Sequence, residues 1–357
     1  MTCSIDIPLF DLSYTNSKIK DYILAVVEHH IANSTFILGP DVKLFEEKFA
    51  GLVGCKYAVG VNSGTDALII GLKALGIKSG DEVITVPNSY IATAQAIVLI
   101  GATPVFVDVD DTMNIDLNLV QAAVTSKTKA IIPVHLYGFP VDIPKLRTII
   151  GENIFILEDC AQSHGALVGN QFAGNMGNIG SFSLHPAKIL SSLGDAGIIT
   201  TNDEQMSRRC KLYRNFGLED RDSSVLMGSN SRLDNLYAAI MYKKIDLFEQ
   251  MLGKRLENAS VYYDEFADFG PVILPPQQKG YKNVHNFFVI RVSERDALKN
   301  YLEQNGIETK IHYPIPIHLQ ISFQQFGYKP GNFPEAEKQT KTILTLPVAE
   351  HLNTDQV

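Results

Sequence analysis

Short apolar segments alternate with longer amphipathic segments from about residue 57 to residue 201. The short segments have the length and flanking turn residues of strands, and the longer ones carry apolar residues at helical spacing. We expect strands at Tyr57–Val61, Glu82–Val86, Pro104–Val109, Ala130–His135, Ile154–Leu157, Ile179–Leu184 and Gly197–Thr201. We expect helices from Asn62 to about Leu75 and at Ala92–Ile100, Leu117–Val124 and Ile143–Ile150.

This alternation predicts an α/β fold with a mostly parallel sheet and helices on both faces. Right-handed crossovers bring the carboxyl ends of the strands to one rim, where ligands bind in open sheets. Two helical segments precede the first strand: residues 12–31, and a helix whose expected cap is Asp41. The buried stripe expected for that second helix is Leu44, Phe45, Phe49 and Leu52.

The pattern changes after Asp203. Glu204–Phe216 and Arg232–Ala259 are long helical patterns, and a region rich in proline follows them. The last elements expected are a strand at Asn286–Val292, a helix at Glu294–Gln304 and a further strand at Glu308–His312.

We therefore expect a large domain over residues 1–247 and a smaller C-terminal α+β domain over residues 248–357. The triplet Asn353-Thr354-Asp355 has the composition of a helix cap, so we expect a helix that continues beyond Val357.

Composition narrows the classes of function. The 357 residues are 45% hydrophobic and 20% charged, as in ordinary globular proteins. A net charge of −8 without a basic run disfavours binding to nucleic acid or to a membrane surface. No apolar run reaches the ~20 residues that span a bilayer, and no signal-peptide pattern opens the chain. The four Cys residues lack a CxxC pair, which indicates reduced thiols and a cytoplasmic location.

Three polar side chains are expected to meet at the rim of the sheet. Asp159 follows one predicted strand, Ser183 lies near the end of another, and Lys188 comes five residues later. The neighbours of Lys188 are small or apolar, and a lysine in a partly desolvated pocket loses its proton more easily and can attack a carbonyl. Taken alone, Lys188 is better interpreted as a surface lysine, and Asp159 is equally well interpreted as the cap of a turn.

A possible anion site lies where the helix after Val61 begins. Ser63, Gly64 and Thr65 stand at this point, where free backbone N–H groups and the helix dipole favour a phosphate. Ordinary helix capping explains the same residues. The pattern GxxxxGK[ST] is missing and no GxGxxG follows the first strand, which disfavours a P-loop and a nicotinamide dehydrogenase.

Several motifs occur in a definite order along most of the chain. They are GTDAL (64–68), GDEVI (80–84), VFVD (105–108), VHLYG (134–138), EDCAQSHGA (158–166), SFSLHPAK (181–188), GDAG (194–197) and SRLD (231–234). In this order and spacing they resemble the DegT/StrS-type sugar aminotransferases. Members of that family use pyridoxal 5'-phosphate and have the aspartate-aminotransferase fold, also called fold type I.

The resemblance implies a role for each matching residue. Lys188 would hold the cofactor covalently and transfer a proton, and Asp159 would keep the ring nitrogen protonated so that the ring accepts electrons. The other implied cofactor contacts are Tyr90 on the ring face, Gln162 near the ring hydroxyl, and Gly64, Thr65, Ser183 and Asn230 at the phosphate. Asn230 would come from a neighbouring subunit, which implies a homodimer with shared active sites. Tyr313 and His318 are the implied substrate contacts, and no metal is expected.

By this resemblance the protein moves the amino group of L-glutamate to a nucleotide-linked keto-sugar, for the biosynthesis of surface polysaccharides or glycosides. Some family members carry His in place of the lysine and act as sugar dehydratases, so Lys188 favours transamination. Another pyridoxal-phosphate reaction and a regulator that has lost its chemistry stay open as alternatives. Phe216 replaces the more usual His of an RNHG-type turn, which makes a polar role there doubtful. The nucleotide, the sugar and the aminated carbon, third or fourth, stay open as well.

Overall fold

The computed structural model describes residues 5–357 and contains a large seven-stranded sheet. The strand order is β1-β9-β8-β5-β4-β2-β3. Among the described residues, β9 is antiparallel to both of its neighbours, and the other six strands share one direction. This confirms the predicted mostly parallel sheet. The strands are β1 Tyr57–Val61, β2 Glu82–Thr85, β3 Thr103–Phe106, β4 Thr128–Ile131, β5 Phe155–Asp159, β8 Ile179–Ser183 and β9 Gly197–Thr201.

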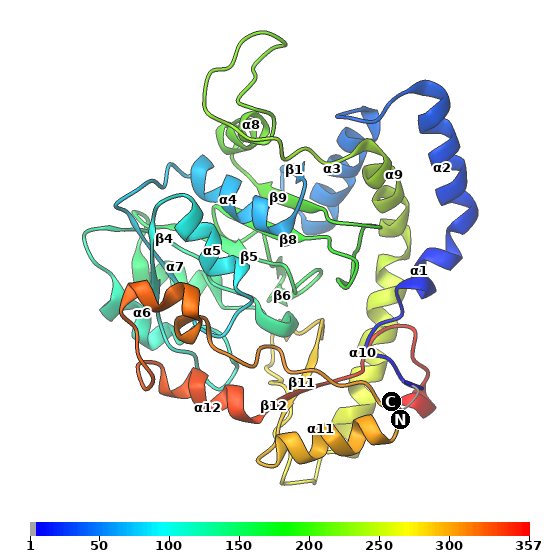
Figure 1. Ribbon diagram of the computed structural model, residues 1–357, viewed down its shortest axis with the longest axis vertical. Helices are drawn as coiled ribbons and strands as arrows, with labels where there is room; N and C mark the ends of the chain where they lie inside the picture. The colour runs from blue at the N-terminus through cyan, green and yellow to red at the C-terminus, as the bar shows by residue number, and fades with distance from the viewer. Residues whose placement is uncertain (1–4) are drawn as a thin grey trace.

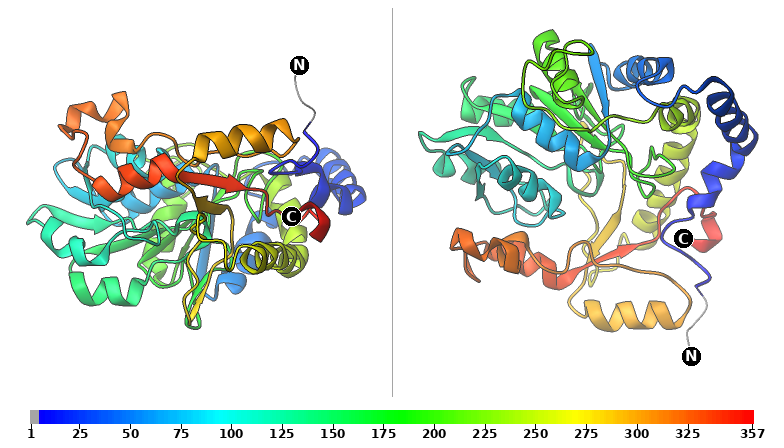
Figure 2. Two further views of the ribbon diagram at one scale, coloured as in Figure 1. Left: turned by 90° about the horizontal axis from the view of Figure 1, so that it is seen from below. Right: turned by 45° about the horizontal axis from the view of Figure 1, so that its top comes forward.

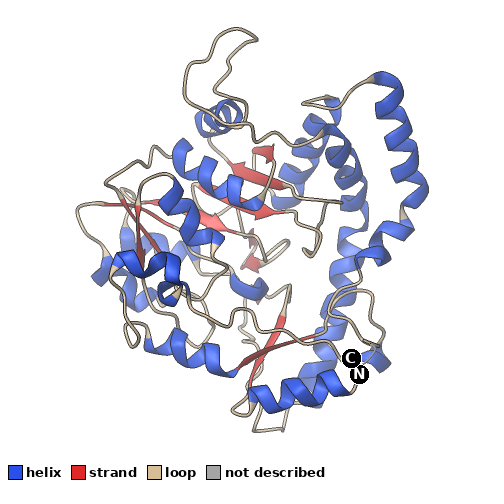
Figure 3. Ribbon diagram, in the orientation of Figure 1, coloured by secondary structure: helices blue, strands red, loops and turns tan. Residues whose placement is uncertain are grey.

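Helices cover both faces of this sheet, as Figures 1 and 3 show. α4, α5 and α8 share one apolar core with the sheet, whereas α3, α6, α7 and α9 pack on the other side. Their bounds are α3 Pro40–Val53, α4 Gly64–Ala74, α5 Ala92–Leu99, α6 Leu117–Ala123, α7 Ile143–Ile150, α8 Glu204–Tyr213 and α9 Asn235–Lys244. The helices at the N-terminus, α1 (Leu12–Lys18) and α2 (Lys20–Asn33), run along the edge of the molecule beside α9 and α10 (Figure 2).

Neighbouring residues of the central strands enter opposite cores, because side chains alternate along a strand. Val83 and Leu157 pack with α4, whereas Ile84 and Ile156 pack on the opposite face with α6 and α7. All four side chains are fully buried. Burial of one such side chain contributes about 1.5–3 kcal/mol. The sheet is therefore rigid in the middle, and its rim is where polar side chains can be placed for chemistry.

A second, two-stranded sheet is formed by β11 (Phe288–Arg291) and β12 (Ile343–Leu346), which pair antiparallel. It packs with α10 (Phe248–Glu265) and α11 (Arg295–Gln304), and α12 (Pro334–Thr342) leads into β12. A short third sheet, in the order β10-β6-β7, comprises Tyr281–Lys282, Leu167–Val168 and Gln171–Phe172. The domain division predicted between residues 247 and 248 falls where the 3-10 helix η2 (Ile245–Leu247) meets α10, and it stays a prediction.

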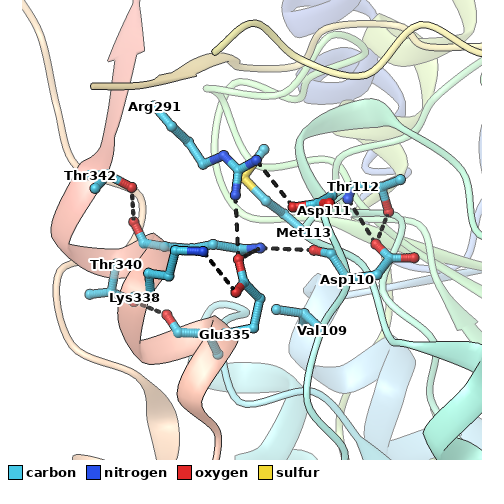
Figure 4. A network of polar contacts seen from close by, with 12 residues as sticks. Val109, Asp110, Asp111, Thr112, Met113, Arg291, Glu335, Lys338, Thr340 and Thr342 are labelled. Carbon is cyan, nitrogen blue, oxygen red and sulfur yellow. Dashed lines mark hydrogen bonds and ion pairs between the residues drawn. The ribbon is translucent and has the colours of Figure 1, made fainter. Parts of the chain in front are cut away.

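Polar contacts join α12 to the loop that follows β3 (Figure 4). The Asp108 carboxylate accepts hydrogen bonds of 2.9 Å from the backbone N–H groups of both Glu335 and Ala336, at the N-terminus of α12. Arg291 of β11 points to Asp111 and Glu335, at 3.4 and 3.5 Å. Carboxylates at a helix N-terminus offset the positive end of the helix dipole. The C-terminal segment is thereby fixed to the large sheet close to the rim.

The strand predicted at Glu308–His312 is wrong. Lys310 forms an isolated bridge to Thr345, and Ile307, just before the segment, forms another to Ile7, instead of one ladder. The strand that pairs with β11 is β12, which the apolar pattern had not revealed. The reason is that two different neighbours share the backbone groups of this segment, so no continuous pairing develops.

Two details of the N-terminal and central helices also differ from the prediction. The cap of α3 is Gly39, not Asp41, because the side chain of Asn235 accepts the backbone N–H of Asp41 and so replaces a local cap. Leu44 is exposed, since the face that α3 buries carries Phe45 and its helical neighbours instead. The long pattern over 232–259 is divided into α9, η2 and α10.

Candidate active site

A cavity of about 390 Å³ opens at the rim formed by the carboxyl ends of the parallel strands. Such a volume lies within the range of cofactor and small-molecule sites. The cavity brings together most of the residues predicted from the sequence. These are Gly64, Thr65, Tyr90, Asp159, Gln162, Ser183, Lys188 and Tyr313. They come from the segments after β1, β2, β5 and β8 and from the segment after α11, so the fold alone makes them neighbours.

Lys188 lies in the connection between β8 and β9 and lines the cavity. The two residues after it, Ile189 and Leu190, are fully buried in the apolar core, which anchors this connection. Burial lowers the pKa of Lys188 to about 8, and the nearby Asp159 carboxylate acts in the opposite direction. A substantial fraction of Lys188 is therefore a neutral amine near pH 8, as attack on a carbonyl requires.

Asp159 ends β5 and is 4% exposed. Its side chain accepts a hydrogen bond of 2.8 Å from the Thr93 hydroxyl and one of 3.2 Å from the backbone N–H of Ala161. Burial raises the pKa of Asp159, while the Thr93 hydrogen bond and the charge of Lys188 lower it. A cationic ring nitrogen placed against this carboxylate would hold it in the ionised state.

The start of α4, predicted to hold an anion, lies beside Ser183. The Ser63 side chain caps the helix by accepting the N–H of Asp66 at 3.0 Å, and the first backbone N–H groups of any helix have no partner within it. A Cβ atom on Gly64 would lie 2.6 Å from the Cβ of Ser183, and one on Gly197 would lie 2.3 Å from the Ser63 carbonyl oxygen. Only glycine fits these two positions, so the turn at Gly64 lies directly against β8 and β9 and faces the cavity.

Gln162 connects two aromatic residues at the cavity wall. Its Oε1 accepts the backbone N–H of Tyr137 at 2.7 Å, and its Nε2 donates to the Tyr313 hydroxyl at 3.1 Å. The Tyr313 ring lies 5.5 Å from the ring of Tyr90, which is 56% exposed. Tyr90 thus offers a ring face for stacking on a planar ligand.

The structure adds cavity residues that the sequence had not singled out for a role. Thr93 holds Asp159, and no motif marks it, because a threonine on an apolar helix is unremarkable in sequence. His312 stacks on Phe287, with ring centroids 4.1 Å apart, and accompanies Tyr313 into the site. His185 and Asp195 also line the cavity, and both lie inside motifs that had been recognised for other residues. The signal for His312 was available in the sequence HYP, which contains Tyr313.

Two predicted site residues lie elsewhere. His318 is fully buried, contacts Glu337 at 3.1 Å and does not line the cavity, so its contact with a substrate stays a prediction that this position does not support. Asn230 is exposed, bridges to Asn215 and does not line the cavity of its own chain. Figure 1 shows the loop between α8 and α9, which contains Asn230, extending away from the body of the molecule. Phe216, also in this loop, is exposed.

A cluster of three buried residues, His135, Glu158 and Cys160, lies at the end of β5. The His135 Nδ1 atom accepts the backbone N–H of Val141 at 2.9 Å, so its Nε2 carries the proton and donates to Glu158 at 2.9 Å. Glu158 also accepts three backbone N–H groups, from residues 174, 176 and 177. Burial raises the pKa of Cys160, which keeps the thiol protonated. Because these lone pairs and protons are already engaged, the cluster is a hydrogen-bond network rather than a metal site.

The donor set of the cavity fits the cofactor expected from the sequence. An amine with a lowered pKa and a buried carboxylate line the cavity, and the helix start predicted to hold an anion lies beside Ser183. This is the arrangement of an enzyme that binds a phosphorylated aldehyde through a lysine.

Comparison with known proteins supports this class. Residues 17–357 match the DegT/DnrJ/EryC1/StrS aminotransferase family. The chain therefore belongs to this family, as the sequence motifs had indicated, and it is an aminotransferase.

Two curated relatives and one solved structure illustrate the similarity. The pleiotropic regulatory protein of Geobacillus stearothermophilus is 39% identical, over 99% of this chain and 96% of its own length. The UDP-N-acetyl-3-dehydro-alpha-D-glucosamine 3-aminotransferase of Acidithiobacillus ferrooxidans is 38% identical, over 100% and 96%. The crystal structure of S. venezuelae DesV with a ketimine intermediate has a TM-score of 0.95 and 35% identity, over 98% of this chain and 95% of that chain.

Proposed function

We propose that this protein is a pyridoxal-phosphate-dependent aminotransferase that moves an amino group from L-glutamate to a nucleotide-linked 3-keto-sugar. The observation that carries the proposal is the placement of Lys188 and Asp159 in one cavity beside the predicted anion site. Relatives support the substrate class: one at 38% identity is named for a UDP-linked 3-dehydro sugar, and one at 35% identity for a dTDP-linked 3-amino sugar. Solved relatives named for their bound pyridoxamine phosphate support the cofactor, among them NtdA of Bacillus subtilis at 30% identity.

The cofactor, when bound, supplies an aldehyde that receives the amino group and a ring that accepts the electrons of the broken C–H bond. Lys188 would hold it through its amine, and Asp159 would face the ring nitrogen. The N–H groups of Gly64 and Thr65 and the hydroxyl of Ser183 would hold the phosphate. Tyr90 would cover one ring face, and Gln162 would lie near the ring hydroxyl.

Lys188 has a second task once the donor has displaced it. With the cofactor bound, its neutral amine would take the proton from the α-carbon of the donor and would deliver it to the cofactor carbon that receives the amino group, as base and then acid. A pKa of about 8 suits both roles, because the amine is present in both protonation states near neutral pH. The anchored connection around Ile189 and Leu190 restricts where this amine can travel.

The size of the cavity indicates which parts of the substrate would lie inside it. About 390 Å³ accommodates a cofactor and a sugar ring, so a nucleotide lies outside, beyond the cavity mouth. Tyr313 lies where the sugar would enter and presents its hydroxyl, which Gln162 orients.

A homodimer is part of the proposal. Asn230 lies on an exposed loop outside its own cavity, and a second copy of the chain would bring it to the phosphate. Equal mixtures of the inactive variants Lys188→Ala and Asn230→Ala would then regain part of the activity, because mixed dimers contain one intact site. No recovery after subunit exchange would count against a shared site.

The location in the cell and the domain division also remain proposals. Cys55, Cys160 and Cys210 are free thiols, which supports a reducing, cytoplasmic compartment. Within residues 5–357, no helix combines the length and the apolar character needed to cross a bilayer. The division at residue 248 is supported by the separate core that α10 and α11 form with β11 and β12.

The decisive test supplies glutamate together with UDP- and dTDP-linked 3-keto and 4-keto sugars and follows 2-oxoglutarate. We expect 2-oxoglutarate and a 3-amino sugar in equal amounts, with at most slow turnover of 4-keto sugars. Loss of a sugar hydroxyl without consumption of glutamate would instead identify a dehydratase. No turnover despite bound cofactor would identify a regulator that has lost its chemistry.

A further inference from the structure

A second buried lysine lies behind the connection that carries Lys188. Lys244 is the last residue of α9 and is 1% exposed. Its Nζ atom donates a hydrogen bond of 2.8 Å to the backbone carbonyl of Ser191 and lies 3.5 Å from the Ser191 hydroxyl. Ser191 follows Lys188 by three residues, so the two lysines act on the same short segment.

Residues 184–192, here called the lysine loop, follow β8 and contain no helix or strand. Its two ends are joined by a backbone hydrogen bond of 2.7 Å from Ser192 to Leu184. Leu184 also donates a backbone hydrogen bond of 2.8 Å to Ala196, which lies beyond the loop. Between these ends, Ile189 and Leu190 anchor the loop by burial in the apolar core, and the backbone N–H of Lys188 bonds to the His185 carbonyl at 2.9 Å. The hydrogen bond from Lys244 adds a fixed direction, because hydrogen bonds depend on angle. The contact with Lys244 is thus a directional anchor close to Lys188.

Lys244 lies among buried and polar side chains beside a small cavity. A cavity of about 30 Å³ lies between the lysine loop and α10, and both Lys188 and Lys244 line it. Arg255 and Glu350, at 2.5 Å from each other, line the same space, together with Asp11 and His351. Burial lowers the pKa of Lys244 to about 8, and Glu350 acts in the opposite direction. An amine this deeply buried is costly unless its hydrogen bonds compensate for lost water.

We propose that Lys244 is a positioning residue that fixes the lysine loop from behind and thereby aims the amine of Lys188. The proposal rests on the proposed function in one respect, that Lys188 is the cofactor lysine. Without the Lys244 donor, the Ser191 carbonyl is left buried and unpaired, and the loop shifts to find another partner. A displacement of about 1 Å at the reacting amine is enough to slow a reaction by about 10²-fold.

The experiment compares three variants. Lys244→Met keeps the length of the side chain but removes the donor, and Lys244→Arg restores a donor, for which the 30 Å³ cavity gives room. Lys243→Met is the matched control, because the neighbouring Lys243 is 41% exposed and pairs with Asp246 at the surface. The measurements are backbone hydrogen exchange of residues 184–192 in the cofactor-free protein, kcat and KM for glutamate, and the pH midpoint of the absorption band of bound cofactor.

We expect Lys244→Met to speed exchange in the lysine loop about tenfold, with little change elsewhere. We expect kcat to fall about 10- to 100-fold while KM for glutamate stays within about threefold, and the pH midpoint of the band to shift. Lys244→Arg should recover most of the loss, and Lys243→Met should stay within about twofold of the wild type. If Lys244→Met does not fold, Lys244→Leu, which also lacks a donor, replaces it with the same expectations.

A lower melting temperature together with unchanged loop exchange, kcat and pH midpoint overturns the proposal, since Lys244 would then only stabilise the core. Exchange that rises equally throughout α9 and the loop also overturns it. Failure of the proposed function looks different: the wild type would then lack the cofactor link at Lys188, while the exchange measurement on cofactor-free protein would still report whether Lys244 holds the loop.

Discussion

Two neighbouring carboxylates at the end of β5 face different regions of the molecule. Glu158 is 0% exposed and does not line the cavity. It accepts hydrogen bonds from His135 and from three backbone N–H groups. Asp159 is 4% exposed and points to the cavity, where it accepts one hydroxyl and one backbone N–H. Nearly equal burial therefore goes with two different hydrogen-bond environments.

The difference shows what separates a structural from a functional carboxylate. Glu158 joins the segment before β8 to β4 and β5, and its acceptor capacity is used within the protein. Asp159 lies near the amine of Lys188, and its carboxylate can still accept a hydrogen bond from a cationic ring in the cavity. Buried carboxylates occur at both kinds of place, so the direction of the free acceptor decides, not burial.

The largest effect should come from Asp159→Asn. Removing the charge that faces the ring nitrogen should lower kcat by about 10²–10³-fold, as for the loss of other preorganised charges. The melting temperature of the cofactor-free protein should stay the same or rise, because a buried charge with few partners is lost. Steady-state kinetics and thermal unfolding check both parts. A variant that keeps wild-type kcat would remove Asp159 from the site.

Glu158→Gln should show the opposite pattern. Three backbone N–H groups and His135 lose a charged acceptor, which should cost about 2–4 kcal/mol in the free energy of unfolding. The protein that remains folded should keep kcat within a few-fold, because Glu158 does not line the cavity. Urea unfolding of the cofactor-free protein provides the measurement. Equal losses of activity in Glu158→Gln and Asp159→Asn would erase the contrast between them.

Thr93→Val sharpens the comparison by removing the hydroxyl that bonds to Asp159, together with its 2.9 Å contact to the Ser89 hydroxyl. The side chain keeps its shape but no longer donates at 2.8 Å to the carboxylate. Loss of this bond removes an interaction that lowers the pKa of Asp159, so the carboxylate becomes easier to protonate. We expect kcat to fall about tenfold, which corresponds to 1.4 kcal/mol. The matched control is Thr148→Val, on the exposed side of α7, which should leave kcat unchanged.

The smallest effect concerns pH. The cofactor-free protein should bind the aldehyde faster as pH rises from about 7 to 9, with a midpoint near the Lys188 pKa of about 8, because only the neutral amine attacks. Asp159→Asn should move this midpoint to lower pH, since the Asp159 charge raises the pKa of Lys188. Glu158→Gln should leave the midpoint in place. Stopped-flow absorbance across this pH range provides the test, and a midpoint near 10 in the wild type would speak for an exposed lysine.

The same pKa has a consequence for stability. A lysine with a folded-state pKa near 8 and an ordinary value of 10.5 binds fewer protons in the folded than in the unfolded protein between these pH values. The free energy of unfolding therefore gains a contribution as pH rises from about 8 to 10.5, and this contribution is absent below pH 8. Lys188→Met should remove that part of the pH dependence.

The sequence predicted the sheet, its helices and most of the cavity, because these depend on local alternation and on motifs at strand ends. Asp159, Ser183 and Lys188 each follow a strand of the same rim, so topology alone brings them together. The strand β12 was missed, since its partner lies far away in the chain and no turn connects the two.

Side-chain contacts between distant elements were beyond reach for the same reason. Thr93 reaches Asp159 from α5, and Lys244 reaches Ser191 from α9, and neither pairing has a spacing that a sequence can show. His318 was expected at the cavity because its motif lies next to Tyr313, yet the 3-10 turn at Ile317–Leu319 directs it to Glu337. The role of Asn230 depends on a second chain, which one sequence does not describe.

The central claim is that one amine, that of Lys188, binds the cofactor opposite Asp159. Reduction of the cofactor-loaded protein with borohydride, followed by peptide mass spectrometry, tests it most directly. The account predicts the reduced cofactor on the peptide that contains Lys188, and none on any peptide of Lys188→Ala. A cofactor attached to another lysine, Lys244 included, or no attachment in the wild type, would contradict it.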